Sequence, residues 1–225
     1  MRHGESLLNK AKAHSPVLFQ TAADRAPFLD MPDHKVDLTP EGERQARVTG
    51  KALHKRGISV DMAYHSGYLR TKKTLDLALE AYPESERQRI QTRCSIFLRE
   101  REAGFAYNVT AAESKEYFPW HEQYWQTHGP VFARPPGGES IADVIQRVNS
   151  FQKTMHEEAA GKDVLISLHG RVLAAMRFLY EDWSYEELEQ FVHGGDHKNC
   201  GITIYEYSDE AKKMVLKEYN TCYWA

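Results

Sequence analysis

The chain has 225 residues, enough for one large domain with an insertion, and its 41% hydrophobic and 27% charged residues are typical of a globular protein with a buried core. A net charge of −3 and a pI near 6.4 argue against a basic face for nucleic acid or anionic membranes, although a small basic cluster such as residues 70–73 could bind an anion. No apolar run approaches the roughly 18 to 20 residues of a membrane span, and no signal-peptide core precedes the first motif.

The first elements in chain order are a loop region, a capped helix and a strand. Residues 10–38 carry three prolines and scattered polar residues, which predicts loop. Thr39 and Pro40 form a helix start, with Thr as N-cap and Pro at the first helical position, and we expect this helix to pass Leu53 and stop near Gly57. The elements expected next are a strand over 58–64, a helix over 68–82 and a strand over 93–97.

The second half of the chain begins with a long stretch, residues 104–138, that is rich in aromatics and predicted to be irregular. A capping pattern at Ser140 starts a helix whose apolar residues recur at helical spacing as far as Met155. The apolar run over 163–168 predicts a strand buried on both faces. The remaining elements are a helix over 171–181, a helix from Ser184 with a capping box completed by Glu187, and a hairpin of residues 201–207 and 214–220.

This alternation of strands and helices predicts an α/β fold, a three-layer α/β/α sandwich whose mostly parallel sheet is flanked by helices. We expect residues 1–225 to form a single domain, with a lid-like insertion at about 104–138. Three cysteines, Cys94, Cys200 and Cys222, are odd in number and widely spaced. They predict buried free thiols in a reducing compartment, and therefore a cytoplasmic protein.

Polar side chains follow each predicted strand of the sheet. Ligands of open α/β sheets bind beyond the carboxyl ends of the strands. The residues at these positions are Ser66 and Arg70, then Arg99, Glu100, Arg101 and Glu102, and then His169, Gly170 and Arg171, while the opening stretch adds Arg2, His3, Ser6 and Asn9. We therefore expect two histidines, at least two arginines and a carboxylate to gather at one edge of the sheet.

Such a set of side chains suits phosphoryl transfer. A neutral imidazole can attack phosphorus, arginines and helix N-termini bind the phosphoryl oxygens, and a carboxylic acid can protonate the leaving oxygen. No metal or other cofactor is required if two arginines and the second histidine supply the charge. Each residue alone is weak evidence, because any one of eleven histidines is more often a surface or core residue. The histidines without comparable context, which are left out of the set, are His65, His121, His128, His193 and His197.

Six motifs, in order across nearly the whole chain, resemble those of the histidine phosphatase superfamily, which includes the cofactor-dependent phosphoglycerate mutases. They are RHGESLLN at 2–9, SGYLRTKKT at 66–74, LREREAG at 98–104, GGES at 137–140, LHGR at 168–171 and NCGIT at 199–203. The stretch PDHKVDLTPEG at 32–42 is also similar to the broad phosphatase branch.

The resemblance implies a role for each member of the candidate site. His3 would be the nucleophile, and Glu100 would be the proton donor, with Glu102 as the less favoured alternative. The phosphoryl group would be held, and its transition-state charge stabilised, by Arg2, Arg70 and His169. Further phosphate or substrate contacts are expected from Ser6, Asn9 and Gly170. Gly4 would let the backbone approach closely.

Two positions depart from the family pattern. The family has an apolar strand directly before its Arg-His-Gly, whereas here only Met1 precedes it, so we expect that residues upstream are missing from the sequence. Ala103 stands where an aromatic residue is common, and Phe105 is expected to fill that space.

The resemblance predicts a metal-independent phosphatase of a small phosphorylated metabolite, with a phosphohistidine intermediate and no nucleic-acid or membrane partner; a homodimer is compatible with it. The alternatives are a phosphoglycerate mutase-type isomerase and a non-catalytic binding protein, the latter disfavoured because His3, His169, both arginines and Glu100 are intact. The lid candidate holds eight aromatic residues, three glutamates and only Lys115 and Arg134 as cations. An acidic, aromatic lid suits an apolar leaving group better than a phosphoglycerate.

Overall fold

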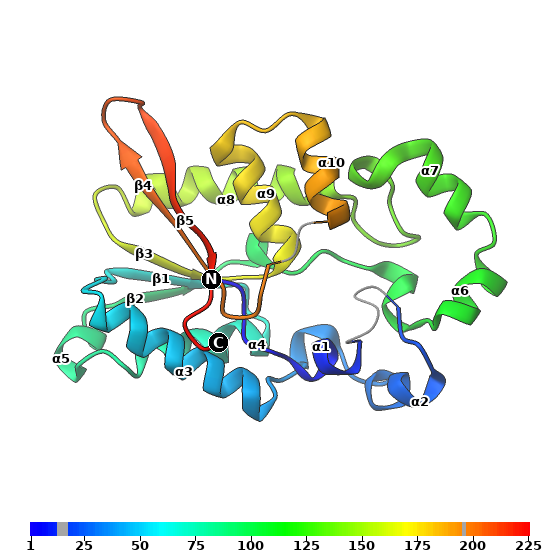
Figure 1. Cartoon of the computed structure of the whole chain (residues 1–225), viewed down its shortest axis with the longest axis horizontal. Helices are drawn as coiled ribbons and strands as arrows, with labels where there is room; N and C mark the ends of the chain where they lie inside the picture. The colour runs from blue at the N-terminus through cyan, green and yellow to red at the C-terminus, as the bar shows by residue number, and fades with distance from the viewer. Residues whose placement is uncertain (13–17, 195–196) are drawn as a thin grey trace.

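The computed structural model describes residues 1–12, 18–194 and 197–225, apart from the side chains of residues 193 and 194. Three parallel strands, β1 (Met62–His65), β2 (Gln91–Cys94) and β3 (Val164–Ser167), form a sheet in the order β2-β1-β3. Helices cover both faces of this sheet (Figure 1). The predicted α/β sandwich with a parallel sheet is therefore confirmed.

Alternate residues of the central strand β1 divide the core into two halves. Met62 and Tyr64 pack against α8 (Ile141–Glu158) and α9 (Gly170–Glu181), whereas Ala63 packs against α4 (Leu69–Leu79). The helix α3 (Pro40–Lys55) lies against α4 on that second face (Figure 1). This arrangement leaves the carboxyl ends of β1 and β3 at one edge of the sheet, where the loops that carry Ser66 and His169 begin.

A second sheet is the antiparallel C-terminal hairpin of β4 (Ile202–Ser208) and β5 (Lys213–Thr221), as predicted. Residues 1–3 lie between the two sheets. On one side, Leu168 N donates to Met1 O (3.0 Å) and His3 N donates to Leu168 O (3.0 Å). On the other side, Cys200 N donates to Arg2 O (3.1 Å). The start of the chain is thus fixed by backbone hydrogen bonds, and with it the position of His3.

Local capping signals set the helix boundaries where the sequence predicted them. Thr39 Oγ1 accepts from Gly42 N (3.0 Å) at the start of α3. Ser140 and Asp143 form a capping box at the start of α8. The predicted box of Ser184 with Glu187 caps α10 (Tyr185–Gly194). The other helices are α1 (Leu7–Ala11), α2 (Ala22–Arg25) and α5 (Glu84–Arg87), with 3-10 turns at Ala26–Phe28, Asp33–Lys35, Ile96–Leu98 and Gly104–Asn108.

Five expectations require correction. The region 104–138 is largely helical, with α6 (Ala111–Tyr117) and α7 (His121–Phe132), because Thr110 and Glu113 form a capping box at the start of α6. The region 10–38 is not loop alone, since it contains α2 and two 3-10 turns. The strand placed at 93–97 is instead β2, an exposed edge strand two residues earlier. β3 is half-buried over residues 164–166, since its second edge is paired only near its end. Cys94 is exposed and only Cys200 is buried, although all three thiols are free.

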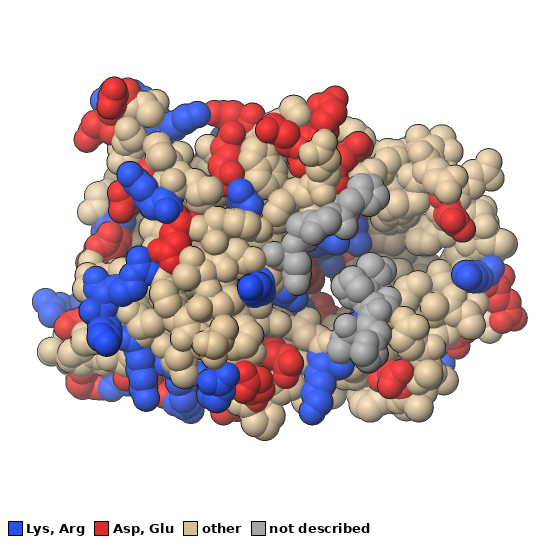
Figure 2. Space-filling view, in the orientation of Figure 1, with Lys and Arg blue, Asp and Glu red and all other residues tan. Residues whose placement is uncertain are grey.

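The surface carries acidic and basic side chains interspersed over the face seen in Figure 2. No helix of the described residues combines the length and apolar character needed to span a membrane.

Candidate active site

Two histidines from different segments meet at the edge of the parallel sheet. His3 follows the opening strand-like residues, and His169 follows β3 as the N-cap of α9. Their ring centroids lie 5.2 Å apart in an edge-to-face arrangement. The exposed fractions of the two residues are 3% and 0%, so both imidazoles are held inside the protein.

The hydrogen bond of His3 determines which of its nitrogens can react. His3 Nδ1 lies 2.7 Å from the carbonyl oxygen of Gly4. A carbonyl can only accept, so Nδ1 carries the proton and Nε2 keeps its lone pair. Burial, followed by the positive charges of Arg70 and Arg2, holds the pKa of His3 well below its ordinary value. His3 is therefore a neutral imidazole at neutral pH, with the lone pair of Nε2 available to act as a nucleophile.

The backbone next to His3 packs so closely against neighbouring backbone that only glycine fits at positions 4 and 42. A Cβ on Gly4 would lie 2.4 Å from the carbonyl oxygen of Gly42, and a Cβ on Gly42 would lie 2.0 Å from the carbonyl oxygen of Glu5. Gly4 N also donates to Thr74 Oγ1 (2.9 Å), and Asn199 Nδ2 donates to His3 O (2.9 Å). The His3 backbone is thus positioned by contacts to α3, α4 and the loop before β4.

A chain of hydroxyl groups orients His169. Thr71 Oγ1 donates to the carbonyl oxygen of Tyr68 (2.9 Å), so it accepts from Ser66 Oγ (2.8 Å). Ser66 Oγ has then given away its only proton and must accept from His169 Nε2 at 2.9 Å. His169 Nδ1, which is buried and has no hydrogen-bond partner among the described residues, is left facing the site.

Glu100 is the carboxylate that reaches this histidine. Glu100 Oε2 lies 3.6 Å from His169 Nδ1, while its Oε1 accepts from Arg101 N (2.8 Å). Glu102, in contrast, is exposed and its Oε1 accepts from Gly104 N (3.0 Å). Of the two candidate proton donors, Glu100 lies beside the histidine pair.

Arg147 of α8 holds the segment that carries Glu100. Its guanidinium donates to the carbonyl oxygens of Phe97 (2.6 Å) and Glu100 (3.3 Å), and it pairs with Glu139 through Nε (2.9 Å) and Nη2 (3.0 Å). Glu139 also binds Arg99 (2.5 Å). Arg147 is a positioning residue, because it fixes the backbone of Glu100 and forms no hydrogen bond with either histidine among the described residues; its charge acts on His169 only at a distance.

The two arginines of the candidate set are anchored in different ways. Arg70 is 3% exposed, and its Nη1 donates to the backbone carbonyl (2.7 Å) and carboxylate (2.8 Å) of Asp33. Arg2 donates through Nη1 to the carbonyl oxygen of His197. A Cβ on Gly170 would lie 3.9 Å from Arg2 Nε, so this glycine borders the same guanidinium.

Ser6 and Asn9 form the capping box of α1. Ser6 N donates to Asn9 Oδ1 (3.2 Å), Asn9 N donates to Ser6 Oγ (3.1 Å), and Asn9 Oδ1 also accepts from Asn199 Nδ2 (3.2 Å). Their observed contacts are therefore local caps, and the expected phosphate contact of Asn9 stays a prediction.

Several residues around the site were not singled out from the sequence. Asp33 falls in the 32–42 stretch that resembles the phosphatase branch, and this is the signal that could have found it. His197 lies outside the predicted set, yet its carbonyl oxygen accepts a hydrogen bond from Arg2, and burial, with the charges of Arg177 and Arg2, lowers the pKa of its imidazole to about 3. No sequence pattern marks His197 or Arg147.

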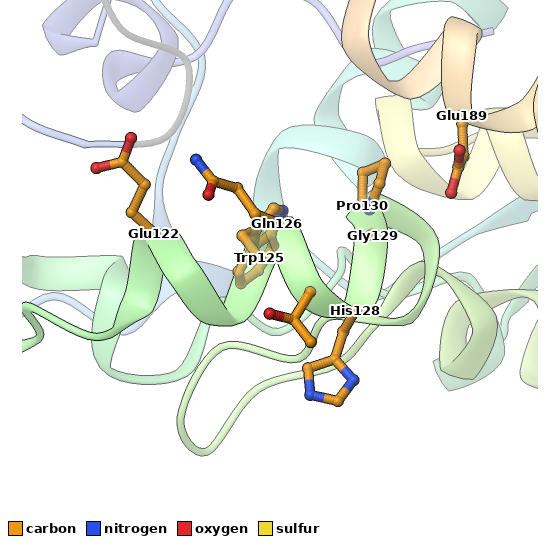
Figure 3. A pocket seen from close by; sticks show the side chains of 8 residues that line it. Glu122, Trp125, Gln126, His128, Gly129, Pro130 and Glu189 are labelled. Atoms are coloured by element: carbon orange, nitrogen blue, oxygen red, sulfur yellow. The ribbon is translucent and has the colours of Figure 1, made fainter.

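Two hollows lie outside the histidine pair. One of about 690 Å³ lies between α7 and α10, with Trp125, His128 and Glu189 among its lining residues (Figure 3), and none of the candidate catalytic residues lines it. The other, of about 520 Å³, is lined by residues 29–33 and by residues between 102 and 108. Because Asp33 lines the second hollow and binds Arg70, that hollow adjoins the candidate site.

Known proteins resemble this chain in sequence and in fold. The family model described as "Histidine phosphatase superfamily (branch 1)" matches residues 1–220. The chain is 31% identical over 192 residues to a 2,3-bisphosphoglycerate-dependent phosphoglycerate mutase 2 of Gloeobacter violaceus, covering 84% of this chain and 78% of that one. It is 28% identical over a 248-residue alignment to the phosphoglycerate mutase of Lachnoclostridium phytofermentans, covering 97% and 89%.

Among solved structures, the α-ribazole phosphatase of Shigella flexneri matches with a TM-score of 0.75 at 20% identity, covering 98% of this chain and 94% of that one. A mycobacterial glucosyl-3-phosphoglycerate phosphatase matches with a TM-score of 0.68 at 20% identity, covering 97% and 96%. Similarity at these identities shows a shared fold.

Proposed function

Because the chain belongs to the histidine phosphatase superfamily, and so is an enzyme that acts on phosphate esters, we propose that it is a metal-independent phosphatase of a small phosphorylated metabolite. The observation that carries the proposal is the pairing of His3, whose Nε2 lone pair is available, with His169 at 5.2 Å. Arg2 and Arg70 border this pair and supply the positive charge that a phosphoryl group needs.

The proposed reaction has two steps. His3 Nε2 attacks phosphorus, the P–N bond forms, the bond to the leaving oxygen breaks, and Glu100 gives that oxygen a proton. Glu100, now a carboxylate, takes a proton from water as the water attacks the phosphohistidine. The P–N bond then breaks, His3 returns to its neutral form, and inorganic phosphate leaves.

The intermediate provides the test of this mechanism. Acid-quenched enzyme should retain label from a ³²P-labelled substrate, and the bond should be acid-labile and base-stable, as expected of a phosphohistidine. The His3→Ala variant should keep its fold and take up no label. Labelling of His3→Ala would assign the nucleophile to another residue and contradict the proposal.

A mutase is the second candidate, because the sequence relatives are named phosphoglycerate mutases. We favour hydrolysis, since the lid cation Arg134 is paired with Asp143 of α8 (2.6 Å) and is thereby engaged away from the histidines. Supplying 3-phosphoglycerate with a bisphosphoglycerate primer, and following both 2-phosphoglycerate and free phosphate, separates the two. Isomerisation much faster than phosphate release would establish the mutase.

We also propose a single domain over residues 1–225, with α6 and α7 as its lid, and a cytoplasmic location. The shared core of α4, α8 and α9 around the sheet supports the single domain. The three free thiols support a reducing compartment.

A further inference from the structure

We propose that the 520 Å³ hollow beside Arg70 receives the alcohol part of the substrate and selects alcohols that are uncharged or cationic over those that carry a carboxylate or a second phosphate. This inference rests on the proposed function, because it places the phosphoryl group at His3 and asks where the rest of the ester lies. It names the class of leaving group that the site accepts.

The hollow lies next to the residue proposed to bind the phosphoryl group, Arg70, and close in sequence to the proposed proton donor, Glu100. Its lining includes Asp33, whose carboxylate binds the guanidinium of Arg70 at 2.8 Å. The lining also includes Glu102, two residues beyond the proposed proton donor Glu100. A phosphoryl group bound by Arg70 therefore has this hollow as a neighbouring space for its ester substituent.

The walls offer apolar surface to such a substituent. Leu29 and Phe105 line the hollow and are 50% and 67% exposed, although both side chains are large and hydrophobic. Tyr107 and Met31 contribute further apolar atoms. Exposed apolar side chains that line a hollow next to catalytic groups are the usual means of binding the non-reacting part of a small ligand.

The charged side chains that line the hollow are all negative. Three carboxylates line the hollow, and no lysine or arginine is among the lining residues that the structure describes. Asp33 is neutralised by Arg70, whereas Asp30 and Glu102 form no ion pair with a described residue. Lys12 does not line the hollow, but it lies next to it: its Nζ donates to the carbonyl oxygen of Tyr107 (3.3 Å) and lies 4.4 Å from the centre of the Phe19 ring and 5.4 Å from the centre of the Tyr107 ring.

Two unmatched negative charges repel an anionic substituent and attract a cationic one. The exposed ring of Phe105 adds to the preference, since an ammonium group is attracted to the face of an aromatic ring. A phosphate ester of an apolar or amino alcohol is therefore favoured over a phosphoglycerate, whose carboxylate would enter an acidic hollow.

Three aryl phosphates that share one scaffold test the selection: phenyl phosphate, 3-(aminomethyl)phenyl phosphate and 3-carboxyphenyl phosphate. We expect kcat/KM to be highest for the ammonium ester and lowest for the carboxylate ester, with about tenfold or more between them at low salt. Hydrolysis of all three at equal rates, or a preference for the carboxylate, would overturn the inference while leaving the phosphatase intact.

The double variant Asp30→Asn/Glu102→Gln should reduce that ratio to about threefold or less, because it removes both unmatched charges. A matched control with the same charge change, Glu157→Gln/Asp209→Asn, alters exposed positions on α8 and in the C-terminal hairpin and should leave the ratio as it is in the parent. An unchanged ratio in the Asp30/Glu102 variant would contradict the assignment of the two carboxylates.

Benzylphosphonates with the same ammonium or carboxylate substituent separate this inference from the proposed function, because they have no ester bond to break. Calorimetry should show tighter binding of the ammonium compound, and a smaller difference in the double variant. If no ester is hydrolysed but this preference holds, the phosphatase proposal fails and the hollow is still assigned. Equal affinities of the parent for both phosphonates would overturn the inference.

Discussion

Ser66 Oγ lies 2.9 Å from His169 Nε2, and this hydrogen bond decides which nitrogen of His169 faces Glu100 and the candidate site. Thr71 takes the only proton of Ser66, so the serine oxygen can serve His169 only as an acceptor. The histidine is thereby held with Nδ1 toward Glu100, at 3.6 Å. The Ser66 hydroxyl, which need not touch the substrate, thus sets the orientation of the His169 imidazole, which we propose does touch it.

Ser66→Ala should therefore lower kcat by roughly 10- to 100-fold, the usual effect of removing a group that orients a functional histidine. The tautomer of His169, observed by ¹⁵N chemical shifts, should become mixed at neutral pH. Ser150→Ala, an exposed serine of α8, is the control and should change neither quantity. A single unchanged tautomer in Ser66→Ala would show that the hydroxyl chain does not fix the ring.

Glu100→Gln should slow esters with poor leaving groups far more than p-nitrophenyl phosphate, because nitrophenolate leaves without a proton. Glu102→Gln is the matched variant two residues away, and we expect no such dependence on the leaving group. The measurement is the slope of log kcat/KM against leaving-group pKa for each variant. Parallel slopes for parent and Glu100→Gln would assign Glu100 to binding.

Arg147→Met should destabilise the protein by about 3 kcal/mol, because it leaves the partly buried Glu139 with Arg99 alone and removes the donor to the carbonyl of Glu100. The control Arg134→Met breaks an exposed pair with Asp143 and should change the free energy of unfolding by less than about 1 kcal/mol. Urea denaturation measures both. Comparable effects of the two substitutions would contradict the positioning role of Arg147.

The stability of the fold should decrease as the pH falls below about 6.5. Burial lowers the pKa of His3, His169 and His197, so these imidazoles stay neutral in the folded protein while the unfolded chain takes up protons near its ordinary pKa of about 6.5. Between pH 7.5 and 5.5 each contributes up to about 1.4 kcal/mol, or roughly 4 kcal/mol for the three. Urea midpoints that do not change across this interval would refute the assignment of neutral, buried histidines.

Activity should persist in EDTA. Among the described residues, no group of three or more His, Cys, Asp or Glu side chains is arranged to hold a metal, and we propose that Arg2 and Arg70 supply the positive charge. The assay is hydrolysis of p-nitrophenyl phosphate after dialysis against EDTA. A loss of activity that Mg²⁺ or Zn²⁺ restores would show that this account of the charge is incomplete.

Local signals in the sequence predicted those elements whose ends are fixed by their own residues. Thr39 caps α3 and Ser140 caps α8 through side chains three residues from their partners, so neither depends on the rest of the fold. The same kind of signal, Thr110 with Glu113, also precedes α6, but the density of aromatic residues after it suggested an irregular lid. The predicted position of β2 was wrong by two residues because its four residues are all exposed and show no apolar alternation in the sequence.

The candidate site was less accessible to sequence reasoning where its contacts run through the backbone. Arg70 and His169 could be picked out because their motifs follow separate predicted strands, and His3 because it lies in the Arg-His-Gly motif that opens the sequence. The carbonyl oxygen of His197, which holds Arg2, belongs to a peptide unit that any residue could provide. The ion pair between Asp33 and Arg70 joins residues 37 positions apart in the chain, and hydrophobic periodicity in a sequence does not predict such a long-range contact.

The close approach of Gly4 and Gly42 makes the location of His3, the proposed nucleophile, a property of the main chain. A single added methyl group at either glycine would meet a carbonyl oxygen at 2.4 Å or 2.0 Å, and a carbonyl cannot turn aside as a flexible side chain can. In an exhaustive substitution library, these two positions should therefore be as intolerant as His3 itself, although neither glycine supplies a reacting atom. Variation in the walls of the hollow beside Arg70 should instead be tolerated, so leaving-group preference can drift during evolution while the reacting centre stays fixed.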